Sequence, residues 1–350
     1  MTGAAVYLDH LGGREVALRM VDGQPDDLLI DGQGMRPGTI CRAIADRPMK
    51  GQGGMFLRGP RGSLFLRQVR GLAPGQTLAV QVTGCPEPGK AVPVTAKPLF
   101  KGRYAIVTPG APGLNVSRAI RDAALREALL DLATDAMGAG DGGAAEVGLI
   151  LRSACAGADP QAVTDDIRAM RDLAGKVMAA AADGPAATLV AGAGPHALAR
   201  RDWPRPDTFD CRPGCLAAAG LLDVIDALRD PCVALSGGSG AGASMWVEAT
   251  RALVAVDVNT GSDISPAAGL RANIAAARAL PRQLRLRGLG GQIVVDFAPM
   301  PKKDRRGVEA ALRVALRADP VETAAVGWTP LGHYELQRKR DRVPLSDLPV

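Results

Sequence analysis

The chain reads Leu253-Val254-Ala255-Val256-Asp257-Val258-Asn259 and, further along, Gly291-Gln292-Ile293-Val294-Val295-Asp296-Phe297. Each run is short, aliphatic and bordered by glycines or polar residues, which predicts two buried strands. A charged carboxylate at the end of a buried strand is costly unless something pairs with it, and two such carboxylates repel, so a cation between them is the natural solution. Side chains two residues apart share one face of a strand, so Asn259 points the same way as Asp257. Two carboxylates and one amide form an all-oxygen set that suits Mg²⁺ better than zinc.

The residues between these runs, about 266–287, are expected to form a helix and so complete a β–α–β unit. Pro281 inside that helix should kink it. From Pro281 to Arg317 the chain has nine Arg or Lys residues and three acidic ones. Such a charge run fits a solvated face, and it also fits a contact with a nucleic-acid backbone beside the expected metal site.

Composition allows several buried cores and an anionic partner. The 350 residues exceed one ordinary domain, and 47% of them are hydrophobic although only 3% are aromatic. The net charge of +6 and the pI of about 9.2 fit an anionic partner without proving one.

Targeting signals and close cysteine pairs are not prominent in this sequence. The start of the chain lacks a basic region followed by an apolar core, and no apolar run reaches the length of a membrane span. The six cysteines are scattered, and only Cys211 and Cys215 lie close together, which favours reduced thiols over a zinc site. We therefore expect a cytoplasmic protein with no membrane span and no structural zinc.

The first part of the chain is rich in short strands. Residues 1–35 alternate as a three-stranded meander. Residues 36–97 contain five short strands split by Gly and Pro with no helix, which predicts a small barrel such as an OB-fold. Phe56 and Phe65 lie on neighbouring strands of it among basic residues. They fit a platform that stacks single-stranded bases, and they fit core positions equally well.

An α/β pattern follows over residues 98–183. Helices are expected from Ser117 and from Asp159-Pro160, around a strand that ends at Arg152-Ser153. A guanidinium beside a hydroxyl can hold a phosphate, but an arginine in this place can also form a local ion pair. Residues 184–237 show one clear helix, from about Gly214 to Arg229.

Two ordered segments, from Glu248 to Gly261 and from Arg282 to Phe297, resemble signatures of the ribonuclease E/G family of bacterial endoribonucleases. The resemblance implies a multidomain α/β protein with a β-barrel. Its expected parts are a split, non-catalytic ribonuclease H-like domain at 1–35 and 184–237, an inserted OB-fold RNA-binding domain at 36–97, a 5′-phosphate sensor domain at 98–183, and a DNase I-like catalytic domain at 238–350.

The resemblance also implies site residues. Mg²⁺ held by Asp257 and Asp296 would polarise the scissile phosphate and lower the pKa of a bound water, and Asn259 would orient a carboxylate or the water. In-line attack then leaves a 5′ phosphate and a 3′ hydroxyl. The positions that match the family's RNA contacts are Phe56, Phe65, Lys90, Gly102, Ile106, Arg118, Arg152 and Ser153. Among these, Ser153 stands where the family usually has Thr.

The departures from the family bear on activity and assembly. Pro299 stands where an acidic residue is common, and Glu322 where a basic one is usual. The family's long members continue into paired cysteines that share a zinc between subunits and into a small dimerisation domain. The sequence shows neither, so we expect a monomer or a weak homodimer. No residue pattern identifies a partner in a degradation complex.

Two functions remain in view. The first is a compact Mg²⁺-dependent endoribonuclease that cleaves single-stranded RNA in RNA processing or decay and senses the 5′ monophosphate. The second is a non-catalytic RNA-binding relative that keeps the fold. The retained Asp257, Asn259 and Asp296 favour the enzyme.

Overall fold

A computed structural model describes residues 3–49, 51, 53–68, 71–87, 89–138, 147–235, 242–263 and 265–348. The chain divides into two compact units. The first unit consists of Met1–Gly32 and Arg205–Val350, and the second of Gln33–Pro204. We describe each unit by itself.

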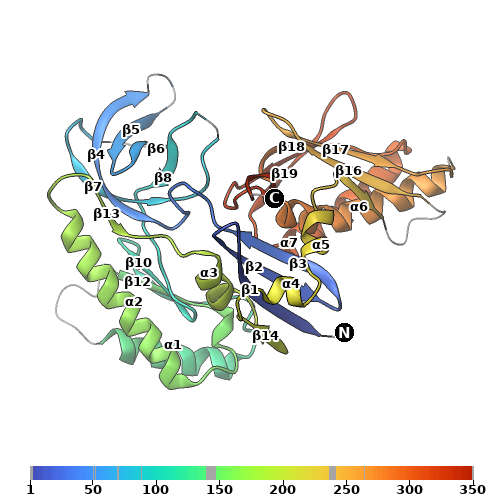
Figure 1. The fold of residues 1–350 in the computed structure, drawn as a ribbon. Helices are drawn as coiled ribbons and strands as arrows, with labels where there is room; N and C mark the ends of the chain where they lie inside the picture. Colours follow the sequence, from blue (N-terminus) through green and yellow to red (C-terminus); the bar gives the residue numbers. More distant parts are fainter. Residues whose placement is uncertain are drawn as a thin grey trace. The chain divides into compact units, whose positions relative to one another are not determined.

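A closed five-stranded barrel forms one half of the second unit (Figure 1). Its strands are β4 (Ile40–Met49), β5 (Gly54–Gly59), β6 (Gly62–Leu66), β7 (Thr77–Val82) and β8 (Val92–Thr95). They pair in the order β4-β5-β6-β8-β7, and β7 pairs back with β4, so the sheet closes. Only the β6–β8 pair within this ring is parallel. The OB-like barrel expected over residues 36–97 is confirmed.

Strand alternation separates the inside of the barrel from its outside. Met55 and Leu57 on β5 and Leu64 and Leu66 on β6 are at most 5% exposed and belong to the barrel core. The intervening aromatic residues therefore point outward, because neighbouring side chains on a strand face opposite ways.

The other half of the second unit is a four-stranded sheet covered by helices (Figure 1). The sheet order is β11 (Gly113–Val116), β12 (Val147–Leu151), β10 (Ala105–Pro109) and β9 (Phe100–Lys101). Helices α1 (Ala123–Met137) and α2 (Pro160–Ala181) pack their apolar sides into one core with it. Asp122 and Asp159 cap these helices, since the Asp122 carboxylate accepts from the N–H groups of Ala124 and Leu125 and the Asp159 carboxylate from that of Gln161. A short 3₁₀ turn, η2 (Ser153–Cys155), follows β12.

The chain is expected to rejoin the domain of the opening strands at residue 184. In the structure it returns to that unit only at Arg205. Before that point, β13 (Ala187–Val190) pairs antiparallel with barrel strand β4. Arg42 on β4 donates to the carbonyl of Ala180 (2.7 Å) in the last turn of α2, and to that of Pro185 (2.6 Å) in the loop that follows. A guanidinium is favourable there because it satisfies carbonyls that the helix leaves free. Helix α3 (Pro195–Asp202) then closes this unit.

The first unit contains a small sheet and a large one. The small sheet has the order β14 (Thr208–Asp210), β1 (Ala4–Leu11), β2 (Arg14–Val21) and β3 (Gln24–Ile30), so the opening meander of three strands is present. Asp9 is 5% exposed and accepts from the backbone N–H groups of Gly214 and Leu216, which ties β1 to the later segment. The single helix expected over 214–229 is instead two short ones, α4 (Cys215–Ala218) and α5 (Leu222–Ala227). Gly220 between them has a φ of 66°.

The large sheet holds the two aspartate runs. Its order is β15 (Cys232–Ala234), β16 (Ser244–Ala249), β17 (Val254–Asn259), β18 (Gly291–Asp296), β20 (Tyr334–Arg338) and β19 (Thr323–Trp328). β17 and β18 are parallel and are joined by α6 (Pro266–Leu286), as expected for a β–α–β unit. α6 continues through Pro281 to Leu286 as one helix.

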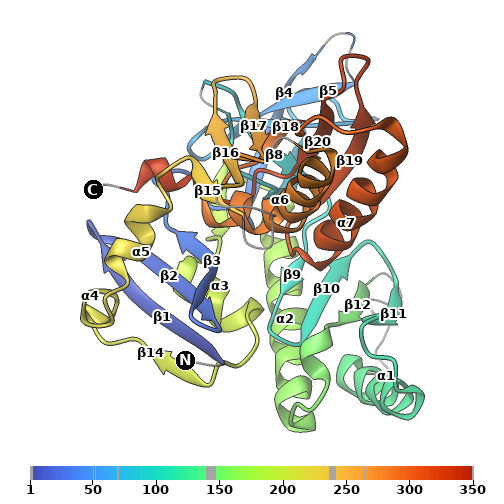
Figure 2. The ribbon, with the colours of Figure 1, turned by 90° about the vertical axis from the view of Figure 1, so that its right-hand side faces the viewer.

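One face of the large sheet is covered and the other is open. α6 and α7 (Arg305–Ala318) pack together and share a core with the strands (Figure 2). The inward strand residues, such as Met245, Val256 and Val295, are at most 2% exposed. The alternate residues of β16, β17 and β18 lie on the face away from the helices.

The end of α6 is held tightly, and this positions β18. Leu289 donates its N–H to the carbonyl of Leu284 and Gly288 to that of Arg285, the paired bonds of a Schellman motif. Gly288 has a φ of 64°, which favours glycine. A Cβ at this position would also collide with the carbonyl of Val343, so glycine is required for both reasons.

Two 3₁₀ turns, η3 (Lys302–Asp304) and η4 (Leu345–Asp347), complete the elements described in the first unit. Across the described part of the chain, no helix is both long and apolar enough to cross a membrane.

Candidate active site

The carboxylate pair, Asp257 and Asp296, lies on the open face of the large sheet. The two residues are register partners on the adjacent parallel strands β17 and β18. Their strand neighbours Val256, Val258 and Val295 are at most 3% exposed, whereas both aspartates are exposed. The tertiary fold thus places side by side, on one face, two acids that are far apart in the sequence.

Asn259 lies on the same face and holds one of the acids. Its Nδ2 donates to Oδ2 of Asp257 at 2.7 Å. This contact is compatible with one of the two roles that the family resemblance implied for Asn259, orientation of the carboxylate. The roles of these three residues remain predictions, although their geometry is compatible with them.

A transverse row extends the carboxylate pair in both directions. Trp246 on β16 is the register partner of Asp257. On the other side, Nε2 of His333 lies 3.9 Å from Oδ2 of Asp296, just before β20 begins. The row Trp246, Asp257, Asp296 and His333 crosses the sheet. Sequence reasoning missed Trp246 and His333, because only the pairing of distant strands brings them beside the two acids.

The basic run from Pro281 to Arg317 divides into two kinds of residue. Arg285 and Arg287 are each 7% exposed. Arg285 bonds to the backbone of Asp26 and to Asp319, and Arg287 bonds to Gln283 and to the carbonyl of Asp230. These two arginines hold the fold together and are not positioned for RNA.

The rest of that run includes a cluster just after β18. Lys302, Lys303 and Arg306 are exposed, and the guanidinium of Arg305 lies 4.3 Å from the centroid of the Trp328 ring. The cluster follows the end of β18 that carries Asp296. It gives this edge of the sheet a positive charge that suits an anionic backbone.

The barrel carries an outward aromatic pair. Phe56 and Phe65 are register partners on β5 and β6, and their ring centroids are 5.2 Å apart. Both are half-buried, and the guanidinium of Arg47 lies 5.1 Å from the Phe56 centroid. Gly54 leaves room for the Phe65 ring, because a Cβ there would collide with it. Of the two expectations for these rings, the outward position agrees with a stacking platform and not with the barrel core.

Lys90 and Arg118 are both exposed. Lys90 forms an ion pair with Glu87 at 2.5 Å, and an exposed pair of this kind is weak enough for a phosphate to replace. The expected RNA contacts of both residues stay predictions.

The arginine pocket, defined by Arg152, Gly102, Asp166 and Asp202, differs from the expected phosphate grip. Arg152 donates to Oδ1 of Asp202 at 2.6 Å and to the carbonyl of Gly102 at 2.7 Å, and its side chain is 20% exposed. Asp166 accepts from the N–H groups of Tyr104 and Ala105 and fills the space beside Gly102.

Two more residues of the expected pocket lie nearby in the chain. Ser153 is exposed at the start of η2, and Ile106 is half-buried on β10.

The carboxyl group of Asp202 ionises more readily than an ordinary aspartate. Burial raises the pKa of its carboxyl, but hydrogen bonds and charges from Arg201 and Arg152 outweigh this and bring that pKa below its ordinary value. Arg152 is therefore already paired with an anionic partner.

Cys211 and Cys215 differ in environment. Cys211 is exposed, whereas Cys215 is buried and burial raises the pKa of its thiol to about 11. The Cys215 sulfur lies 3.6 Å from the carbonyl oxygen of Leu8.

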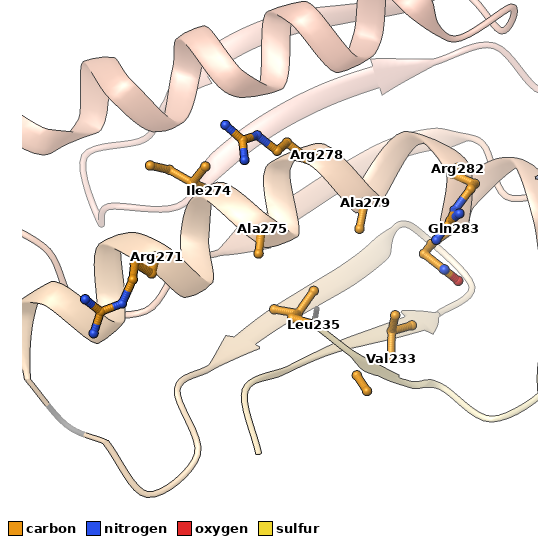
Figure 3. A pocket seen from close by; sticks show the side chains of 10 residues that line it. Val233, Leu235, Arg271, Ile274, Ala275, Arg278, Ala279, Arg282 and Gln283 are labelled. Carbon is orange, nitrogen blue, oxygen red and sulfur yellow. The ribbon is translucent and has the colours of Figure 1, made fainter. Parts of the chain in front are cut away.

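A cavity of about 600 Å³ lies between α6 and β15 (Figure 3). Ala275 and Ala279 of α6 face Val233 and Leu235 across it. Its remaining lining residues are Ala234, Arg271, Ile274, Arg278, Arg282 and Gln283. None of the carboxylate-pair residues lines it, so it is separate from the candidate active site.

Comparison with known proteins gives consistent results. The model of the ribonuclease E/G family matches residues 100–203 and 215–341. Ribonuclease G of Salmonella typhimurium is 42% identical over 106 residues, which cover 29% of this chain and 22% of that protein. Ribonuclease E of Nostoc is 29% identical over 318 residues, 79% of this chain and 45% of that protein. Ribonuclease E of Escherichia coli is 40% identical over 105 residues, 28% of this chain and 10% of that protein.

The chain thus spans less than half of the length of these relatives. The family match itself covers more than half of the chain and includes both aspartate strands, the arginine pocket and the helix between the strands. The chain belongs to the ribonuclease E/G family.

Proposed function

We propose that the protein is a Mg²⁺-dependent endoribonuclease that hydrolyses phosphodiester bonds of single-stranded RNA, in cytoplasmic RNA processing or decay. The observation that carries the proposal is the carboxylate pair, because Asp257 and Asp296 are register partners on one open sheet face. The family's members named ribonuclease G and ribonuclease E support the reaction class.

The residues of the pair fit Mg²⁺ by their chemistry. Mg²⁺ prefers oxygen ligands and is commonly bound by one or two carboxylates together with waters and substrate phosphates. Asp257 and Asp296 would hold it, and the open face leaves space for the waters and the phosphate. When bound, the ion polarises the phosphodiester and lowers the pKa of a water.

The chain's own groups have defined tasks in this proposal. Asn259 keeps the Asp257 carboxylate in one orientation through its 2.7 Å hydrogen bond. Lys302, Lys303 and Arg306 attract the RNA backbone to the edge where β18 ends. Phe56 and Phe65 stack unpaired bases, which a duplex would not offer. The products carry a 5′ phosphate and a 3′ hydroxyl.

Recognition of a 5′ monophosphate at the arginine pocket is part of the proposal. A phosphate there would replace Asp202 as the partner of Arg152 and would use the exposed Ser153 hydroxyl. The ribonuclease H-like nature of the small sheet and the DNase I-like nature of the large one are proposed from the family alone, as is a monomer or weak homodimer.

Substitution of the pair tests the proposal. Asp257→Asn or Asp296→Asn should lower Mg²⁺-dependent cleavage of a short A/U-rich RNA by about 10³-fold, because a lost carboxylate removes several kcal/mol of metal-based stabilisation. Binding of the same RNA, measured by fluorescence anisotropy, should be retained. Undiminished cleavage by either purified variant would contradict the assignment.

A second function, RNA binding without cleavage, is favoured by two observations. Arg152 is already bound to Asp202, and Pro299 stands where the family resemblance implies an acidic residue. RNA binding that depends on Phe56 and Phe65, with no cleavage at any Mg²⁺ concentration, would support this function.

A further inference from the structure

An exposed tryptophan stands beside the carboxylate pair. Trp246 is 40% exposed, although its strand neighbours Met245 and Val247 are 0% and 4% exposed. Strand alternation therefore sets its indole on the open face of the sheet. A side chain of this size gains by covering its apolar surface, and here that surface lies beside the two acids.

The neighbours of the indole on the two adjacent strands are small or polar, and Cys232 is its register partner on β15. Across from it on β17 are Asp257, its register partner, and the diagonal neighbours Ala255 and Asn259. Ala255 is small and Asn259 is engaged with Asp257. Among the described residues, no aromatic ring or cation is recorded against the face of this indole.

The place of Trp246 in the row gives its approximate distance from each of the two acids. Neighbouring strands are separated by about 4.8 Å, so the Cα of Trp246 lies about 5 Å from that of Asp257 and about 10 Å from that of Asp296. An RNA phosphate at the carboxylate pair would bring the bases of its two adjoining nucleotides within reach of the indole.

We propose that Trp246 forms a base-stacking subsite, in which the indole stacks on the unpaired base of a nucleotide next to the scissile phosphate. The inference rests on the proposed function and deepens it. Because every base presents a flat face, such a subsite tolerates sequence variation but requires a single strand. It would hold the RNA at the carboxylate pair itself, independently of the aromatic pair on the barrel.

The test compares kcat/KM for the unmutated protein, Trp246→Ala and Trp246→Phe on one short RNA. A second set of substrates replaces, one at a time, each nucleotide next to the cleaved bond by an abasic one. Trp246→Ala should lower kcat/KM about tenfold on the intact RNA, the typical effect of losing one stacked base. On one of the abasic RNAs the unmutated protein and Trp246→Ala should be equal. Trp246→Phe should recover most of the loss.

A matched control is Phe209→Ala. Phe209 is an aromatic residue of the same unit with 43% exposure, but it lies on β14 of the small sheet. Its removal should leave kcat/KM unchanged. An unchanged rate in Trp246→Ala would overturn the subsite, as would an equal loss on the intact RNA and on every abasic RNA.

A binding measurement separates failure of the subsite from failure of the proposed function. If the unmutated protein cleaves no RNA, the nuclease assignment fails. The subsite is then decided by the fluorescence that Trp246→Phe removes. Single-stranded RNA should quench that component and duplex RNA should not. No quenching, or equal quenching by duplex, would refute stacking at Trp246.

Discussion

The carboxylate pair of the first unit and the arginine pocket of the second differ in how exposed their charged groups are and in whether those groups are already paired. Asp257 and Asp296 are exposed, and the side chain of Asp296 is 62% exposed with a histidine nitrogen 3.9 Å away. Arg152 is 20% exposed and bonded to Asp202 at 2.6 Å. Asp296 has a neighbour that pairs with it only when the histidine is protonated, whereas Arg152 must give up an ion pair to accept a phosphate.

Residues that match a family's sites can therefore lie in different surroundings. Both sites contain the residue types that the family resemblance implies. At the arginine pocket, however, Asp202 occupies the guanidinium and Asp166 lies beside Gly102, so two carboxylates compete with an incoming phosphate. We expect a strong dependence on the carboxylate pair and a weak dependence on the RNA 5′ end.

The largest effect after loss of an aspartate should come from Asn259. Asn259→Ala removes the group that orients the Asp257 carboxylate, and loss of such a partner usually costs 10- to 100-fold in metal affinity or activity, so cleavage should fall by about that factor. The measurement is the Mg²⁺ dependence of kcat, which should shift to higher concentration. A shift no larger than that caused by Thr260→Ala, a neighbouring control, would show that the hydrogen bond has no role.

A smaller effect is expected at the arginine pocket. Cleavage of 5′-monophosphate RNA relative to 5′-hydroxyl RNA should be only a few-fold faster in the unmutated protein, because Asp202 competes for Arg152. Asp202→Asn should raise that ratio, and Arg152→Ala should bring it to about one. A large ratio in the unmutated protein, unchanged in Asp202→Asn, would break the contrast between the two sites.

The smallest effect concerns acid pH. Because the pKa of Asp202 in the folded protein is below its ordinary value of about 3.9, its pairing stabilises the fold above pH 4 and this contribution is lost as pH falls through the folded pKa. Carbon-detected NMR titration should give a midpoint below 3.9 for Asp202. The Arg152→Ala variant should show a higher midpoint, and an identical midpoint would mean that the pair is not maintained in solution.

Prediction from the sequence succeeded for local features, where a short residue pattern is compatible with only one structure. Gly and Pro punctuation indicated the barrel strands, and Asp-Pro at 159–160 indicated the start of α2. It failed where a partner far along the chain decides the outcome. The segment after residue 184 joins the barrel because β13 pairs with β4, and no local pattern encodes that pairing.

The same division holds at the candidate sites. Alternation of apolar and polar residues determined that Asp257 and Asn259 share a face, because the period of a strand is local. The burial of Arg285 and Arg287 could not be inferred, since a basic run looks the same whether its partners are Asp26 and Asp319 or water.

By itself the sequence determined the family, the β–α–β unit and the identity of the two acids. Only the tertiary structure decided that these acids are register partners, that Trp246 and His333 continue their row, and that Arg152 is paired with Asp202. The physical reason is that strand character and capping depend on neighbours in the chain. Register between strands and the pairing of buried or half-buried charges depend on which distant segments the folded core brings together.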